Sequence, residues 1–160
     1  MRGSIIWLVL GIIVAVAIQS ALPRITVSGI PFTPDLLLVF LALAGVRKGR
    51  IFAVFTGFSL GILQDLTTQV NLLGLYAFIK SLSGYALGTI FQYREYWNRT
   101  VRLLAVMVCF LIHFGIYAFV TLYGSEVQII DFLRLIFIPA LLNWILYIIL
   151  EKLFFDLKVG

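Results

Sequence analysis

Apolar stretches separated by short loops follow one another along almost the whole of this chain. Crossing a bilayer takes about 20 apolar residues, and the backbone polar groups must be satisfied within the segment itself. Transmembrane strands would alternate apolar and polar residues, whereas these runs are apolar on all sides. The sequence therefore predicts an all-α integral membrane protein with six transmembrane helices, at residues 4–22, 34–46, 51–65, 72–91, 101–123 and 130–155.

The composition excludes a soluble domain. Of the 160 residues, 62% are hydrophobic and only 12% are charged, whereas a soluble domain is roughly half apolar and about a quarter charged. The same hydrophobicity excludes intrinsic disorder. We expect residues 1–160 to form a single transmembrane helical domain, because the short loops leave no room for a separate soluble module.

The basic residues predict how the helices are oriented. Arg24 lies in a loop on one side of the membrane, and nine basic residues lie on the other: Arg2, Arg47, Lys48, Arg50, Arg94, Arg99, Arg102, Lys152 and Lys158. Loops rich in lysine and arginine stay in the cytoplasm, so we expect both termini to be cytoplasmic. The net charge of +5 is thus explained by topology and the lipid bilayer, and we expect no nucleic-acid partner.

Glycines four residues apart occur in three pairs, Gly45 with Gly49, Gly57 with Gly61, and Gly84 with Gly88. In lipid, this spacing lets helix backbones approach closely. Two interpretations remain open. The glycines pack the helices of this protein against one another, or they form a groove for the transmembrane helix of a partner.

Ionisable residues occur inside the predicted spans. Counting 1.5 Å per residue places Asp35, Asp65 and Lys80 at similar depth toward the outer leaflet, and Arg134 near the outer start of the last helix. A charge at depth costs several kcal/mol, so such groups usually pair. We expect a polar network that fixes helix order, in which Asp65 pairs with Lys80. A ligand or partner site, and unpaired snorkelling side chains, are the alternatives.

No catalytic or metal-binding pattern is present in the sequence. His113 and Asn143 are predicted to be hydrogen-bonded packing residues, the latter between helices. Tyr93 and Trp97 are expected at a membrane interface. Pro34 suits the first turn of a helix capped by Thr33. We therefore expect no enzymatic activity, no catalytic residue, no cofactor and no metal.

The stretch from Pro34 to Gly88 carries a series of motifs. Pro34-Asp35-Leu36-Leu37-Leu38 opens the second predicted helix, and Gly49 follows it. A Gly-Phe-x-x-Gly-x-x-x-Asp pattern comes next, formed by Gly57, Phe58, Gly61 and Asp65. Leu73-Gly74 and then Ser83-Gly84-Tyr85-Ala86-Leu87-Gly88 complete the series. In this order, on about a third of a six-helix chain, these motifs resemble the bacterial rod shape-determining protein MreD family.

This resemblance implies a non-enzymatic scaffold in the bacterial inner (cytoplasmic) membrane, in the cell-elongation machinery. Members of the MreD family bind the single-span protein MreC, and through MreC they join MreB filaments and the peptidoglycan synthases RodA and penicillin-binding protein 2. The family is also similar in fold to the substrate-binding subunits of energy-coupling-factor vitamin transporters. The alternative is therefore a small-molecule-binding transport subunit, with Asp35, Asp65 and Lys80 in its pocket. Whether the protein forms a homodimer is left open.

Overall fold

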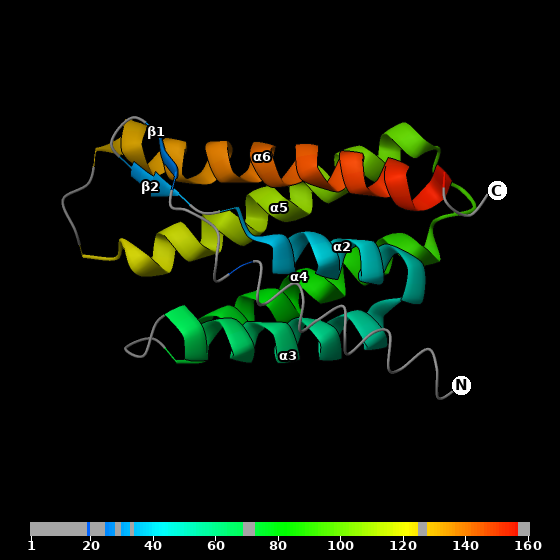
Figure 1. The fold of residues 1–160 in the computed structure, drawn as a ribbon, viewed down its shortest axis with the longest axis horizontal. Coiled ribbons are helices and arrows are strands. Elements are labelled where there is room, and N and C mark those ends of the chain that lie inside the picture. The colour runs from blue at the N-terminus through cyan, green and yellow to red at the C-terminus, as the bar shows by residue number, and fades with distance from the viewer. Residues whose placement is uncertain are drawn as a thin grey trace.

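The computed structural model describes residues 19, 25–27, 30–32, 34–68, 73–124 and 128–156. This part of the chain is a helical bundle with one small hairpin (Figure 1), and its elements are β1 (Ile25–Val27), β2 (Ile30–Phe32), α2 (Leu36–Lys48), α3 (Arg50–Thr68), α4 (Leu75–Gln92), α5 (Arg99–Thr121) and α6 (Ile129–Asp156). The predicted helical fold class is confirmed for the bundle. The first predicted helix, residues 4–22, lies outside the described residues except for Gln19.

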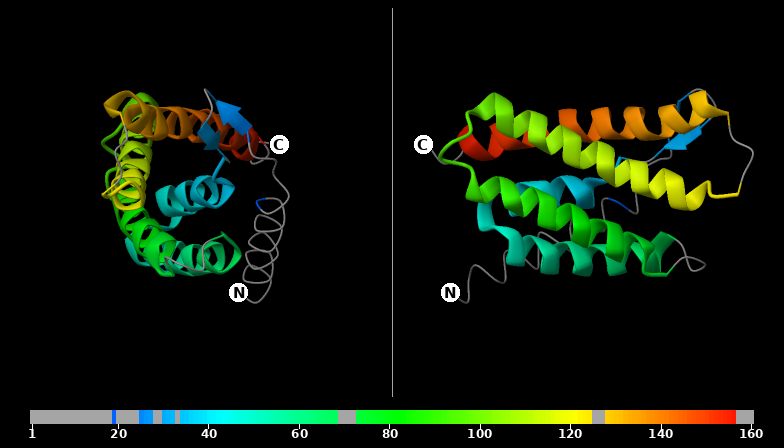
Figure 2. Two further views of the ribbon diagram at one scale, coloured as in Figure 1. Left: turned by 90° about the vertical axis from the view of Figure 1, so that its left-hand side faces the viewer. Right: turned by 180° about the vertical axis from the view of Figure 1, so that it is seen from behind.

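Helix α2 forms the centre of the described bundle. In Figure 2, α3, α4, α5 and α6 form a curved wall on one side of α2 when the bundle is viewed along its length. Helix α2 contacts α3, α4 and α6, and leucines on several of its faces, such as Leu37, Leu38 and Leu41, are fully buried. A helix that is apolar all round is typical of such a central position.

Residues at or near each end of α2 determine where the helix begins and ends. Asp35 is its N-cap and accepts a hydrogen bond from the Leu38 N–H at 2.9 Å. The Gln19 amide oxygen accepts another from the Leu36 N–H at 2.7 Å. The predicted cap at Thr33 is wrong, because the helix begins at Leu36 and the Asp35 carboxylate reaches the free amides directly. Gly49 ends the helix at a φ of +87°, which favours glycine.

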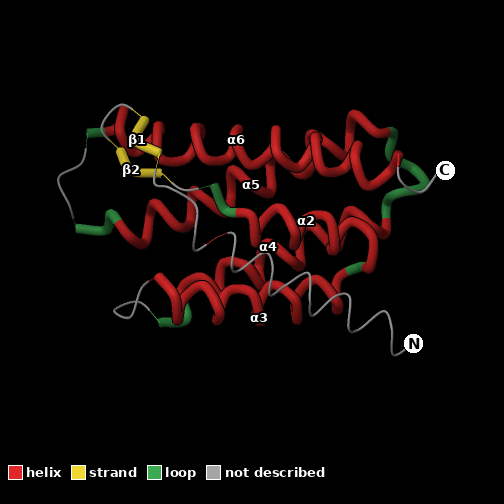
Figure 3. The backbone as a smooth tube through the Cα atoms, in the orientation of Figure 1, coloured by secondary structure: helices red, strands yellow, loops and turns green. Residues whose placement is uncertain are grey.

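The antiparallel hairpin precedes α2 and was not predicted (yellow in Figure 3). Its register pairs Ile25 with Phe32, Thr26 with Pro31, and Val27 with Ile30. The β-branched run Ile25-Thr26-Val27 favours a strand, and only two residues separate the strands, as in the tightest hairpins. A hydropathy profile does not distinguish an apolar hairpin of this length from the apolar helices on either side of it in the sequence.

Helices α3 and α4 form the closest contact in the bundle. A Cβ atom added to Gly57, Gly61, Gly84 or Gly88 would lie less than 3 Å from the backbone of the other helix of this pair. Gly57 lies against the Lys80 carbonyl, and Gly84 lies against the Ala53 carbonyl. Glycine is required at these positions because any side chain would separate the two backbones. Gly45 of α2 lies against Leu87 and Ala53 at the junction of the three helices.

Helices α5 and α6 are long and apolar enough to cross a membrane. The Trp144 indole N–H donates to the Leu103 carbonyl at 2.8 Å and links them. Asn143 donates to the Pro139 carbonyl of its own helix at 2.8 Å, and the interhelical role predicted for this residue remains a prediction. Helix α2 has 13 residues, or about 20 Å, which is shorter than a hydrocarbon core of about 30 Å. The count of six spans remains a prediction.

Candidate functional site

A buried ion pair joins the centre of the bundle to its wall. Lys80 on α4 donates from Nζ to Oδ2 of Asp35, the N-cap of α2. The Lys80 residue is fully buried and Asp35 is 4% exposed. The other carboxylate oxygen, Oδ1, accepts from the Leu38 N–H. One carboxylate therefore caps α2 and neutralises Lys80, which offsets the cost of burying either charge alone.

His113 on α5 extends this cluster. Its Nδ1 lies 2.9 Å from the Ser83 hydroxyl oxygen, and that hydroxyl donates to the Ile79 carbonyl of its own helix at 2.8 Å. Because the single hydroxyl hydrogen is used there, the Ser83 oxygen accepts from His113, and the imidazole proton is assigned to Nδ1. The Nε2 atom then faces Asp35, 3.9 Å from its Oδ2.

We call Asp35, Lys80, Ser83 and His113 the charged cluster. It brings together α2, α4 and α5. Within the described residues, His113 Nε2 has no hydrogen-bond partner although it is buried. The cluster is a set of groups that mainly bind one another, and such a buried polar set fixes the relative position of the helices that carry it.

The predicted pairing of Asp65 with Lys80 is wrong. Asp65, at 1% exposed, accepts three backbone hydrogen bonds at the start of α4, from Gly74 at 3.0 Å, Tyr76 at 3.0 Å and Ala77 at 3.1 Å. Gly74 is the N-cap of α4 and has no side chain with which to cap it. A carboxylate from α3 takes that role, and it also interacts favourably with the helix dipole.

Arg134 is also separate from the charged cluster. It donates to Asp131 on its own helix at 3.0 Å, and both side chains are partly exposed. The spacing of three residues puts the two groups on the same face of α6. The predicted four-residue network is thus divided into the Asp35–Lys80 pair, the Asp65 cap and an exposed pair near the start of α6.

Several uncharged residues of the family motifs lie just before α2, adopt positive φ angles at helix ends or line a groove. Pro34 offers its carbonyl to the Gln19 amide at 3.0 Å, and Gly49 and Gly74 have positive φ angles of +87° and +98°. Phe58 and Gly74 line a groove between α3 and α4, which we call the α3–α4 groove. Its volume is about 360 Å³, and its other lining residues are Ile62, Asp65, Leu66, Leu73, Ala77, Phe78 and Ser81.

In the described part of the chain, neither a cluster of metal ligands nor an activated Ser83 nucleophile is present. No group of three or more His, Cys, Asp or Glu side chains there could hold a metal ion. His113 and Ser83 are close, but the Ser83 hydroxyl donates to a carbonyl and its oxygen accepts from the imidazole, so it is not activated as a nucleophile.

Sequence reasoning missed that His113 belongs with Asp35 and Lys80. A depth count could have found it, because the three residues lie toward the middle or the outer part of their predicted spans. Ser83, three residues after Lys80, lies on nearly the same face of α4 and was singled out only as part of the Ser83–Gly88 motif.

Comparison with known proteins gives a family match. The sequence profile of the family described as rod shape-determining protein MreD matches residues 1–156. No curated protein matches, and no solved structure matches. The expected similarity to the substrate-binding subunits of energy-coupling-factor transporters therefore remains a prediction.

Proposed function

Since this chain belongs to the MreD family of rod shape-determining proteins, we propose that it is a non-enzymatic scaffold that holds the transmembrane helix of MreC. MreD proteins are a shape-determining structural family of the bacterial inner membrane and are part of the rod-shape complex with MreC and MreB. The observation that carries the proposal is the match over residues 1–156, essentially the whole chain.

Through MreC, the protein would help to link MreB filaments to RodA and penicillin-binding protein 2. The charged cluster supports a scaffold because its charges are bound to one another and hold α2, α4 and α5 together. A transport subunit would use such charges on its ligand. In this cluster the Asp35 carboxylate already binds Lys80 and a backbone amide, so the alternative of a transport subunit is the weaker one.

The α3–α4 groove is our proposed contact for the MreC helix. The two helices approach so closely at their glycines that larger side chains stand on either side of the seam, among them Phe58 and Ile62 from α3 and Phe78 from α4. Phe58 and Phe78 are 51% and 64% exposed. The glycines themselves are covered by the α3–α4 contact, so the partner would meet the phenylalanines rather than the glycine pairs.

Filling the groove tests this proposal. Ser81 is a small residue of the lining and bonds to the Ala77 carbonyl of its own helix, so Ser81→Trp adds bulk without removing a bond to another helix. Overpacking typically costs 1–3 kcal/mol, and about 1.4 kcal/mol is tenfold in affinity. We expect Ser81→Trp to lower the amount of MreC that co-purifies from membranes by about tenfold.

The matched control is Ile112→Trp on α5, where the native side chain is 51% exposed and lies outside the groove. It should capture as much MreC as the parent protein. Full capture by Ser81→Trp, with loss of capture by Ile112→Trp, would place the partner on α5. Failure of all variants and of the parent to retain MreC would contradict the scaffold function itself.

A further inference from the structure

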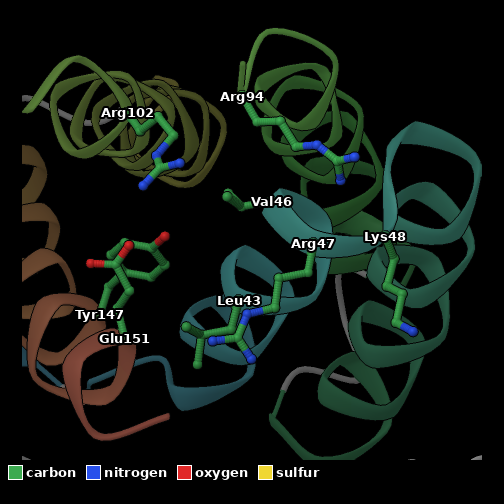
Figure 4. Close-up of a pocket in the computed structure, with 8 residues that line it drawn as sticks. All are labelled: Leu43, Val46, Arg47, Lys48, Arg94, Arg102, Tyr147 and Glu151. Atoms are coloured by element: carbon green, nitrogen blue, oxygen red, sulfur yellow. The ribbon is translucent and has the colours of Figure 1, made fainter. Parts of the chain in front are cut away.

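A second polar region lies at the opposite end of α2 from the charged cluster. It is a cavity of about 430 Å³ between the end of α2, the segment joining α4 to α5, the start of α5 and the end of α6 (Figure 4). Its polar lining residues are Arg47, Lys48, Arg94, Arg102, Tyr147 and Glu151, and we call it the basic pocket. The positive-inside rule assigns this end of the bundle to the cytoplasm.

Positive charge in the basic pocket exceeds negative charge. Four cationic side chains line it with one carboxylate, Glu151. That carboxylate is itself paired with Arg99, which is not one of the lining residues, at 3.3 Å. An excess of positive charge around a cavity raises the local concentration of anions. The pocket therefore favours an anion.

Arg102 provides a second, independent indication. Its Nε atom is buried and has no hydrogen-bond partner among the described residues. Figure 4 shows its guanidinium group directed into the space beside Tyr147 and Glu151. A buried donor without an acceptor is costly. An anion with several oxygens at this place would supply the missing acceptor.

The position of the pocket indicates which anion it receives. Tyr93 and Trp97 stack at a centroid distance of 5.3 Å on either side of Arg94 in the chain, and tyrosine and tryptophan are typical of the level of the lipid headgroups. Lys48 and Arg94 are exposed, Arg47 and Arg102 are half-buried, and Tyr147 and Glu151 are buried. The cations thus run from the surface into the bundle.

We propose that the basic pocket binds the phosphate of an anionic lipid headgroup from the cytoplasmic leaflet, with the Arg102 guanidinium as a principal donor. The guanidinium fork matches phosphate oxygens, and basic pockets between transmembrane helices on the cytoplasmic side are known sites for anionic headgroups. The volume is that of a small-ligand site. This lipid would stabilise the junction of α2, α5 and α6 independently of MreC.

The test uses the full chain, delipidated in a neutral detergent. Four probes are added separately, namely short-chain phosphatidylglycerol, diacylglycerol with the same acyl chains, inorganic phosphate, and an octamer of glutamate. Binding is measured by native mass spectrometry, and stabilisation is measured as the shift in the midpoint of thermal unfolding. We expect only phosphatidylglycerol to bind and to raise the midpoint.

Arg102→Gln should weaken the apparent affinity for phosphatidylglycerol by about tenfold, since it removes the charge-assisted hydrogen bonds from the guanidinium to the phosphate. Arg134→Gln removes the same charge from an exposed ion pair on α6 outside the pocket and should leave the affinity unchanged. Should Arg102→Gln fail to fold, Arg94→Gln at the exposed mouth is the substitute and should also weaken binding.

Three results would overturn the proposal. Equal affinity in the parent and in the pocket variants would show that the lipid binds elsewhere. Stabilisation by inorganic phosphate at the same concentration as the lipid would make free phosphate the source of the anion. Binding of the glutamate octamer in preference to the lipid would identify the basic pocket as a docking site for an acidic protein segment.

Discussion

The Asp35–Lys80 pair gives the sharpest test of how this bundle is held together. Lys80→Met keeps most of the volume of the side chain but leaves the Asp35 carboxylate buried without its cation. Asp35→Asn leaves Lys80 without its anion, while asparagine still caps α2 through the Leu38 amide. Each single change should therefore report the loss of the charge pair rather than the loss of the helix cap.

The expected magnitude follows from the burial of the two groups. Breaking a buried pair by removing one partner costs about 3–5 kcal/mol. A loss of about 3 kcal/mol lowers the unfolding midpoint of a protein of this size by roughly 6–12 °C. The double variant Asp35→Asn/Lys80→Met leaves neither charge, so it should recover at least half of the summed loss, which is a large coupling for a pair in contact.

The assay has a built-in reporter. Cys109 is the only cysteine of the chain and is buried in α5, so a thiol-reactive fluorophore detects unfolding when the thiol becomes exposed on heating. Asp65→Asn combined with Lys80→Met is the matched control, because Asp65 binds the amides of α4 instead of the lysine. That combination should be close to additive. Recovery by Asp65→Asn with none by Asp35→Asn would refute the pairing.

Two further predictions concern helix packing and topology. Gly61→Ala should lower the unfolding midpoint, because the new Cβ would lie less than 3 Å from the Ala77 backbone and overpacking costs about 1–3 kcal/mol. The control is Gly115→Ala, whose new Cβ has nothing within 4 Å in the described part, so its midpoint should be unchanged or slightly raised. Equal midpoints for the two variants would argue against the α3–α4 contact. In a background lacking Cys109, Lys48→Cys at the end of α2 and Gln128→Cys just before α6 should react with an impermeant thiol reagent from opposite sides of the membrane, because the end of α2 and the start of α6 lie at opposite ends of the bundle (Figure 1). Reaction of both from one side would contradict the orientation predicted from the loop charges.

The positions of the helices could be predicted because hydropathy is a local property. The predicted spans 51–65 and 101–123 overlap α3 and α5 almost completely. The predicted helix ends were less accurate, since the end of a helix depends on which group accepts hydrogen bonds from its terminal amides. Helix α4 begins at Leu75 rather than at residue 72, and this difference concealed the role of Asp65, whose acceptors are aimed at the amides of that start.

Which charges pair could not be predicted, because the sequence gives the depth of a residue but not the direction in which it faces. Asp35 and Asp65 come out at similar depth, and either could have been the partner of Lys80. The choice depends on how each helix is rotated about its axis, and the glycine contacts fix this rotation for α3 and α4. The basic pocket was missed for a related reason, since basic residues predicted only to set topology line one cavity together.

The short central helix explains why the polar groups lie where they do. With 13 residues, α2 brings polar groups close to both of its ends, Asp35 at one and Arg47 and Lys48 at the other. A longer apolar helix would place its ends in the headgroups, where water satisfies charge. Because α2 begins inside the bundle, its N-terminus has to be satisfied by protein groups, and Asp35 with Gln19 supplies them. Lys80 then neutralises the Asp35 carboxylate, so the ion pair follows from the need to satisfy the N-terminus of a short helix inside the bundle.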